Sequence, residues 1–236
     1  MRFTQRSFIW MSICAVALIA QANPAFAQKG KGVFAPIKDD PKLPRVLILG
    51  DSISIGYTLA VRELLKGKAN VHRAPTNCGP TTRGLEQIDA WLSDSEWDVI
   101  HFNWGLHDLK RVKADSGKNS NDPTDPRQAE PEQYEANLRA MVERLKATGA
   151  TLVFGTTTPV PDGGVRPHRD PEDSVRYNEI AAGIMKEHGI TVNNLFAVIA
   201  EGDPGYGKPA DVHFTRAGSK ALGDEVVRAI RAAVAR

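Results

Sequence analysis

The sequence has few cysteines and no excess of charge of either sign. Two of its 236 residues are cysteines, Cys14 and Cys78, and 30 Lys and Arg residues stand against 28 Asp and Glu residues. Because Cys14 lies in an N-terminal segment that we expect to be removed, the mature chain is predicted to lack an internal disulfide, and its stability must come from its core. The balanced charge leaves no basic surface that would indicate a nucleic-acid partner.

Long apolar runs are also scarce, and the one that is present lies at the N-terminus. Arg2 and Arg6 precede an apolar stretch over residues 8–20, which is followed by Ala25-Phe26-Ala27. A basic start, a short apolar run and small residues are typical of a secretory signal peptide, which we predict over residues 1–27. The run is short for a membrane span and no second one follows, so we expect no integral membrane segment after signal removal. We therefore expect an exported protein, periplasmic or secreted.

The remaining chain is predicted to form one domain behind a short tether. Residues 28–44 are rich in Gly, Lys and Pro and show no apolar periodicity, which predicts a flexible tether. Within residues 45–236, short apolar runs alternate with amphipathic helical stretches, which predicts a parallel five-stranded sheet with helices on both faces. The strands are expected at 46–49, 70–74, 97–102, 151–154 and 190–192. The long polar segment 110–130 is expected to be a lid or a binding wall.

A serine directly follows the first expected strand. The apolar run ends at Gly50, and Asp51 and Ser52 then open an amphipathic helix. In a parallel α/β sheet, ligands bind at the carboxyl ends of the strands, and the backbone N–H groups of a helix N-terminus favour negative charge there. An oxyanion formed beside Ser52 would find donors in place. The alternative is that Asp51 and Ser52 only cap the helix.

The far end of the chain supplies the groups that a nucleophilic serine needs. A Ser hydroxyl requires a base, usually His, and an acid that fixes the imidazole tautomer; Asp211-Val212-His213 provides both types just before the last helix. The sequence has no Gly-x-Ser-x-Gly motif, which argues against a lipase-type nucleophile elbow. The alternative is that Asp211 caps a turn and His213 is a surface histidine held by a backbone carbonyl.

Four motif blocks together resemble the SGNH, or GDSL-type, hydrolases. They are, in chain order, Gly50-Asp51-Ser52, Cys78-Gly79-Pro80-Thr81-Thr82, Gly105-Leu106-His107-Asp108 and Asp211-Val212-His213. The resemblance implies a flavodoxin-like three-layer α/β/α sandwich and a serine hydrolase that needs no cofactor.

The resemblance also implies roles for particular residues. Ser52 is the expected nucleophile, His213 the general base and Asp211 its orienting acid. The oxyanion donors would be the backbone N–H groups of Ser52 and Gly79 and the side chain of His107. Two positions depart from the family pattern. His107 replaces the usual Asn, and Ala210 stands where the family places its Asp, so that the acid is expected two residues before His213.

Several further residues are candidates with weaker support. Asn103 is an alternative oxyanion donor, and Asn103, Trp104, Arg166, His168 and Arg169 are candidate substrate contacts on loops near the expected cleft. Asp108 is expected to bind loop backbone. The histidines 101 and 107 form no close ligand pair, so no metal site is expected.

The family that the sequence resembles cleaves acetyl esters on carbohydrates, lysophospholipids, aryl esters and thioesters. Export, polar loops and the absence of an apolar stretch long enough to line an acyl tunnel favour a short-chain, acetyl-type esterase acting on a small-molecule or glycan ester. A lysophospholipase or thioesterase is the alternative within the family. A glycan-binding domain without turnover, or an acetyltransferase, is the alternative outside hydrolysis.

Overall fold

The computed structural model describes residues 32–235, and a five-stranded parallel sheet lies at its centre. The strand order is β2-β1-β3-β4-β5, and all neighbouring strands run parallel. The strands are β1 (Arg45–Leu49), β2 (Asn70–Arg73), β3 (Val99–Phe102), β4 (Thr151–Gly155) and β5 (Thr191–Asn193). The expected α/β class and five-stranded sheet are confirmed. The expected signal peptide lies outside the described residues.

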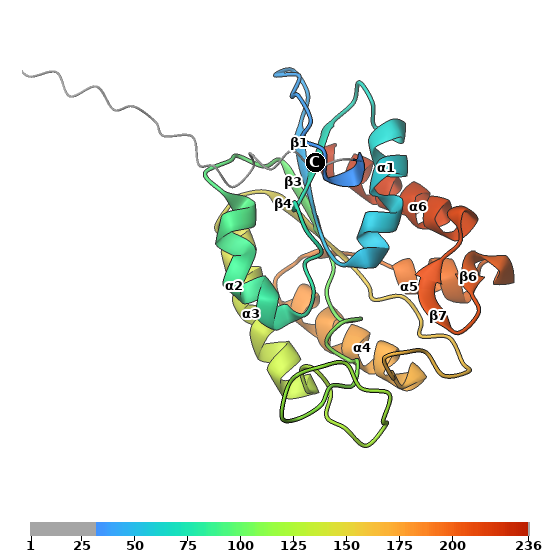
Figure 1. Cartoon of the computed structure of the whole chain (residues 1–236). Coiled ribbons are helices and arrows are strands. Elements are labelled where there is room, and N and C mark those ends of the chain that lie inside the picture. Colours follow the sequence, from blue (N-terminus) through green and yellow to red (C-terminus); the bar gives the residue numbers. More distant parts are fainter. Residues whose placement is uncertain (1–31, 236) are drawn as a thin grey trace, which may run out of the picture.

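Helices cover both faces of the sheet and complete the three layers (Figure 1). One face carries α1 (Ser52–Leu64), α5 (Leu195–Ala200) and α6 (Arg216–Val234); the other carries α2 (Thr81–Leu92), α3 (Pro131–Lys146) and α4 (Pro171–Glu187). The strand order places the topological switch point between β1 and β3, where ligands of such folds bind. Among the described residues, none of the helices has the length and apolar character needed to cross a membrane.

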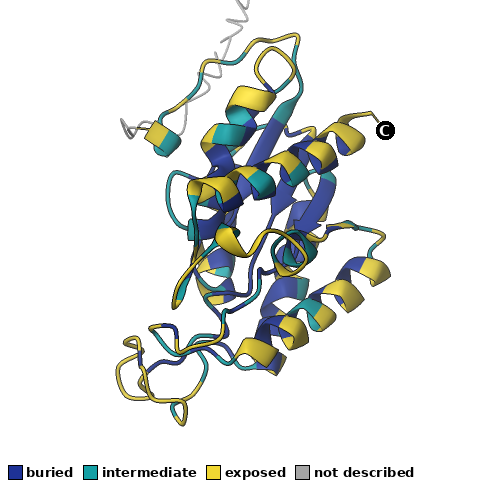
Figure 2. Ribbon diagram, turned by 90° about the vertical axis from the view of Figure 1, so that its right-hand side faces the viewer, coloured by how far each residue is buried: buried dark blue, intermediate teal, exposed yellow. Residues whose placement is uncertain are grey.

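The sheet is buried between the helix layers, as Figure 2 shows. The four apolar residues Val46–Leu49 of β1 are fully buried. A central parallel strand is covered on both faces, which explains why its sequence is a continuous apolar run rather than an alternating one. Burial of each such side chain contributes about 1.5–3 kcal/mol to folding. The burial of β1 fixes the position of its carboxyl end, and Ser52 lies shortly after that end.

A small hairpin that the sequence analysis did not predict precedes the last helix. After the 3-10 turn η3 (Pro204–Tyr206), β6 (Gly207–Lys208) pairs antiparallel with β7 (Asp211–Phe214). Ala210 turns the chain between them with a φ of +52°. The Thr215 hydroxyl then accepts from the Gly218 N–H at 3.3 Å and caps α6. The hairpin fixes the position of Asp211 and His213 relative to α1 and α6.

The part of the expected tether that the structure describes lies against the domain instead. We call residues 32–44, which begin with the 3-10 turn η2 (Gly32–Phe34), the N-terminal strap. The Asn70 amide donates to the Asp40 and Leu43 carbonyls, and the Arg62 guanidinium donates to the Val33 carbonyl. The strap therefore contacts β2, the outer strand of the sheet, through the side chain of Asn70, and Asp39 of the strap also contacts His72 of β2 at 2.7 Å. The strap is held by polar contacts, and its sequence has no apolar periodicity, so the sequence indicated a tether.

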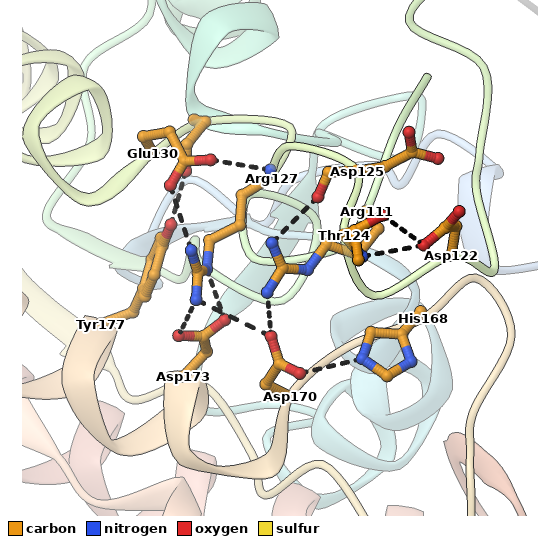
Figure 3. Close-up of polar contacts among 11 residues, drawn as sticks. Arg111, Asp122, Thr124, Asp125, Arg127, Glu130, His168, Asp170, Asp173 and Tyr177 are labelled. Atoms are coloured by element: carbon orange, nitrogen blue, oxygen red, sulfur yellow. Dashed lines mark hydrogen bonds and ion pairs between the residues drawn. The ribbon is translucent and has the colours of Figure 1, made fainter. Parts of the chain in front are cut away.

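The long polar segment 110–130 is folded and docked rather than structureless. Isolated backbone bridges join Arg111 to Arg127 and Val112 to Asn119. Ion pairs then fasten the segment to residues 168–173 (Figure 3): Arg111 pairs with Asp170, and Arg127 forms two contacts with the buried Asp173, at 2.5 and 2.9 Å. The segment therefore forms a fixed wall of the molecule.

Candidate active site

Ser52 is held at the carboxyl end of β1 by its neighbours. It is the first residue of α1, and the Asp51 side chain caps that helix by accepting from the Ile53 N–H at 2.9 Å. A Cβ at Gly50 would meet the Ser54 side chain at 3.0 Å, so a larger residue in the turn from strand to helix would push against Ser54. The first N–H groups of a helix have no partner within the helix, and the Ser52 N–H is one of these.

The structure brings Ser52, His213 and Asp211 together in a hydrogen-bonded chain. The distance from His213 Nε2 to Ser52 Oγ is 2.9 Å, and that from His213 Nδ1 to Asp211 Oδ1 is 2.6 Å. Asp211 also accepts from the backbone N–H of His213 at 3.0 Å. The carboxylate two residues before the histidine therefore does reach the ring, so the spacing that departs from the family pattern preserves this contact.

The protonation states fit a base facing the serine. Partial burial alone would raise the pKa of Asp211, but hydrogen bonds from the His213 backbone and ring hold the pKa below its usual value, so the carboxylate is ionised. An ionised Asp211 accepts from Nδ1–H, which leaves Nε2 as the acceptor toward the Ser52 hydroxyl. The His213 and Asp211 side chains are 46% and 40% exposed, so the chain opens directly to solvent.

Gly79, the second expected oxyanion donor, has its N–H occupied in this structure. The N–H donates to Asn77 Oδ1 at 2.9 Å, and Gly79 has a φ of +63°, in the left-handed region that glycine adopts readily. The amide of Asn77 must move aside before this N–H can serve an oxyanion. The sequence analysis missed this contact, although Asn two residues before Gly is a known turn signal.

His107 lies in the turn after β3, close to the other site residues. Burial lowers its pKa, Asp51 opposes this shift, and the positive charges of Lys110, Arg169 and a protonated His213 lower the pKa further. The imidazole is therefore neutral near pH 7, and a neutral ring carries one N–H that can donate.

Arg169 holds the backbone of this turn through its guanidinium. Its guanidinium is buried and donates to the Leu106 carbonyl at 2.9 Å and the Pro167 carbonyl at 3.2 Å. Burial lowers its pKa to about 10, while Asp51 and Asp211 oppose the shift. Arg169 is therefore buried rather than exposed as expected, because its side chain folds inward to bind backbone.

Asp108 binds loop backbone, as expected, and links two of the motif blocks. It is fully buried and accepts from the Thr81 N–H at 2.8 Å and the Thr81 hydroxyl at 2.5 Å. Asn137 of α3 in turn donates to the Thr81 hydroxyl at 3.0 Å. These bonds hold the Gly79 loop and the His107 turn in fixed relation.

Two of the candidate substrate contacts are buried. Asn103 is 6% exposed and donates one of its two amide N–H bonds to the Gly155 carbonyl at 2.8 Å, and it lines the crevice beside Ser52, so it remains a candidate. Trp104 is 1% exposed, and its ring lies under Gly84 of α2. Both residues lie in the segment that directly follows β3, as the sequence analysis expected, but their side chains are buried rather than exposed.

The other two candidates lie on the segment that docks the polar wall. His168 Nε2 contacts Asp170 Oδ1 at 2.9 Å within the ion-pair cluster of Figure 3. Arg166 is exposed. His168 is therefore a structural member of the cluster, and Arg166 remains a candidate.

A narrow crevice adjoins Ser52. Asp51 and Ile53, the two neighbours of Ser52, line it together with Asn103, Leu106 and residues 156–158. The side chains leave no space in it for a water-sized group, so the described residues form no ligand pocket at this point in the free protein. Among residues 32–235, no group of three His, Cys, Asp or Glu side chains is arranged to hold a metal ion.

Comparison with known proteins places this site in a family. The model of the GDSL-like lipase/acylhydrolase family matches residues 48–221. The fold and site thus define a hydrolase that acts on ester bonds, and the chain belongs to the GDSL-like lipase/acylhydrolase family. No curated protein sequence matches the chain.

Solved structures share the fold at low sequence identity. A lipase/acylhydrolase from Enterococcus faecalis is 19% identical, with a TM-score of 0.66 over 80% of this chain and 96% of that one. A GDSL-like lipase from Bacteroides thetaiotaomicron is 17% identical, with a TM-score of 0.63 over 89% and 100% of the two chains. The acetyl xylan esterase AlAXEase is 16% identical, with a TM-score of 0.63 over 79% and 99%. At these identities the likeness concerns the fold alone.

Proposed function

We propose that Ser52 is the nucleophile of a serine esterase in which His213 is the general base and Asp211 orients it. The observation that carries the proposal is the unbroken chain from Ser52 Oγ through the His213 ring to Asp211 Oδ1, at 2.9 and 2.6 Å. His213 Nε2 takes the hydroxyl proton as Oγ attacks the ester carbonyl carbon. The proton then passes to the leaving alcohol as the ester C–O bond breaks, which leaves an acyl group on Ser52.

Water completes the cycle through the same groups. His213 Nε2 takes a proton from the attacking water, a second tetrahedral species forms, and Oγ leaves with that proton as the carboxylic acid departs. The developing oxyanion is stabilised by the N–H groups of Ser52 and Gly79 and by the ring N–H of His107. For Gly79 this requires the Asn77 amide to release the N–H that it holds in the free protein.

The proposed substrate is an ester with a short acyl group, acetyl in particular, on a bulky polar alcohol such as a carbohydrate. The narrow crevice beside Ser52 leaves no space for a long acyl chain, which favours a short acyl group, and the half-exposed His213 and Asp211 leave room for a large alcohol portion. The acetyl xylan esterase of similar fold has an activity of this kind.

The decisive experiment compares hydrolysis of aryl acetate and aryl octanoate by the wild type and a folded Ser52→Ala variant. Loss of turnover in the variant, with acetate preferred in the wild type, supports the proposal and makes acetylated glycans the next substrates. Preference for octanoate would instead favour a lysophospholipase or thioesterase.

Two further experiments separate the alternatives outside hydrolysis. Labelling of Ser52 by a fluorophosphonate probe is expected for both a hydrolase and an acetyltransferase. Analysis of the products formed with a sugar acceptor present then distinguishes these two. Equal inactivity of the wild type and Ser52→Ala, with no labelling, would favour a glycan-binding domain.

We also propose that the protein is exported and cleaved after Ala27. The support is the basic, apolar and small-residue order of residues 1–27. N-terminal sequencing of the protein from the periplasmic and culture fractions should give a chain that begins at Gln28. An intact Met1 in the cytoplasmic fraction would contradict export.

A further inference from the structure

A second cavity lies under the N-terminal strap, over the outer edge of the sheet. Its volume is about 270 Å³, and it is lined by Phe34 of the strap and by Arg45, Arg62, His72, Arg73 and Trp97. We call it the strap pocket. None of the residues that form the Ser52 site lines it. Its composition is unusual, because three arginines and a histidine surround one small space.

Only part of this positive charge is neutralised. Asp39 serves both Arg45, at 2.8 Å, and His72, at 2.7 Å. Within residues 32–235, neither Arg62 nor Arg73 has an ion pair with a carboxylate. Burial lowers the pKa of both guanidinium groups, and the charge of Arg73 lowers the pKa of Arg62 further. Asp51, which does not line the pocket, opposes the shift of Arg73, but burying two neighbouring like charges with no carboxylate in contact is still costly.

The two arginines differ in what they offer to a ligand. Arg73 is 4% exposed and donates to the carbonyls of Ala74, Gly50 and Thr76. Arg62 donates through Nε to the Val71 carbonyl at 3.0 Å and through one terminal nitrogen to the Val33 carbonyl at 2.9 Å. A guanidinium has five N–H donors, so Arg62 keeps donors for a ligand.

The pocket also has flat apolar walls beside the charge. Trp97 is buried, and the Arg45 guanidinium lies 4.3 Å from the centre of its ring. The Phe34 ring lies 5.2 Å from the Arg73 guanidinium. A ligand that fits both features combines anionic oxygens with a small flat body.

We propose that the strap pocket binds a small organic anion, whose carboxylate, phosphate or sulfate oxygens accept from Arg62 and whose apolar body contacts Phe34 and Trp97. The bound anion supplies the counter-charge that Arg62 and Arg73 lack. The site is independent of the proposed esterase site, because no residue of the Ser52, His213 and Asp211 chain takes part in it.

The test is a titration of the full mature chain with benzoate, inorganic phosphate and sulfate, with neutral benzamide as the uncharged comparison. Binding is measured by calorimetry at constant ionic strength and located by NMR from the indole N–H of Trp97 and the ring signals of His72 and His213. We expect saturable binding of at least one anion with a Kd of about 1 mM or tighter, shifts at Trp97 and His72, and no binding of benzamide.

Two substitutions that each remove one positive charge make the test specific. Arg62→Gln is expected to weaken binding at least about tenfold, because it removes the donors and the charge. Arg176→Gln removes the same charge from an exposed position on α4 and is expected to leave binding unchanged. If Arg62→Gln loses its fold, Arg62→Lys, which keeps the charge but not the planar fork, should bind with intermediate affinity.

Three results would overturn the proposal. The first is the absence of saturable binding of all three anions. The second is an equal loss of binding in Arg62→Gln and Arg176→Gln, which would indicate nonspecific charge attraction. The third is binding whose shifts are confined to His213, which would place the anion at the Ser52 site. Arg73 is left unchanged because its guanidinium holds the Gly50 and Thr76 carbonyls.

Discussion

His107 occupies the position where the family has asparagine, and its surroundings determine what it can donate. Burial lowers its pKa and keeps the ring neutral near pH 7, with one N–H available to an oxyanion. We expect His107→Asn, which restores the family's donor, to keep turnover of aryl acetate within about tenfold of the wild type. His107→Ala should lower kcat by about 10²–10³-fold, the effect of removing one oxyanion donor. An alanine variant as active as the wild type would exclude the ring from the oxyanion site.

Asp211 can be tested in the same way. Asp211→Asn keeps the shape of the side chain but removes the negative charge that fixes the His213 tautomer, so kcat should fall by about 10²–10⁴-fold. The matched control is Asp224→Asn, which removes an equally exposed carboxylate that pairs with Lys220 on α6. If both variants kept full activity, Asp211 would be only a turn residue.

At the scale of elements, buried Asp108 couples the loop that opens α2 to the turn after β3. Burial raises its pKa to about 7, although the bonds from Thr81 oppose the shift, and its second oxygen has no partner among the described residues. The unfolded carboxyl ionises near pH 3.9, so between about pH 4 and 7 the unfolded state loses a proton that the folded state keeps. The free energy of unfolding should therefore fall across this window, by up to a few kcal/mol.

Asp108→Asn isolates this contribution from the other titrating groups. The amide mimics the protonated carboxyl, so the variant should lack this fall. Urea unfolding of both proteins at intervals from pH 4 to 8 measures it: the stability of the variant relative to the wild type should rise up to about pH 7 and then stay level. A difference that does not depend on pH would contradict the assignment.

The wall formed by residues 110–130 depends on one buried ion pair. Arg127 makes two contacts with Asp173, whose side chain is 2% exposed, so Arg127→Gln leaves a buried carboxylate without its partner. We expect a loss of about 3–5 kcal/mol in the free energy of unfolding and faster proteolysis within the wall. Arg139→Gln breaks exposed pairs with Glu135 and Glu187 and should cost no more than about 1 kcal/mol. Similar losses in both variants would mean that burial of the pair does not matter.

At the scale of the whole molecule, the N-terminal strap is docked on the outer strand of the sheet. A chain that begins at Arg45 loses the bonds from Asn70 to the strap and the Asp39 carboxylate that pairs with His72. We expect lower thermal stability, because these polar contacts are lost. Differential scanning calorimetry, with a chain that begins at Gly32 as the control, measures it. If the two chains were equally stable, the strap would contribute nothing to the fold and would be only a tether.

The sequence and the structure agree most closely where the pattern of apolar residues determines the secondary structure. The fully apolar run of β1 and the prolines that open α3 and α4 predicted elements that the structure contains. Agreement fails where polar side chains find distant partners. Trp104 and Arg169 were expected to be exposed loop residues, yet both side chains are buried, and the Arg169 guanidinium binds the Leu106 and Pro167 carbonyls.

By itself, the sequence determined the fold class, the family and the set of residues that carry the expected chemistry, because these depend on local periodicity and on short motifs. Only the tertiary structure decided that Asp211 reaches His213, that Asn77 holds the Gly79 N–H, and that the strap and the 110–130 wall are docked. Each of these is a hydrogen bond or an ion pair whose formation depends on side-chain direction and on the approach of the backbone. The residue order can suggest a local contact, such as that of Asn77 with Gly79, but whether it forms, and which distant partners the strap and the wall find, follows from the packed arrangement of the whole chain.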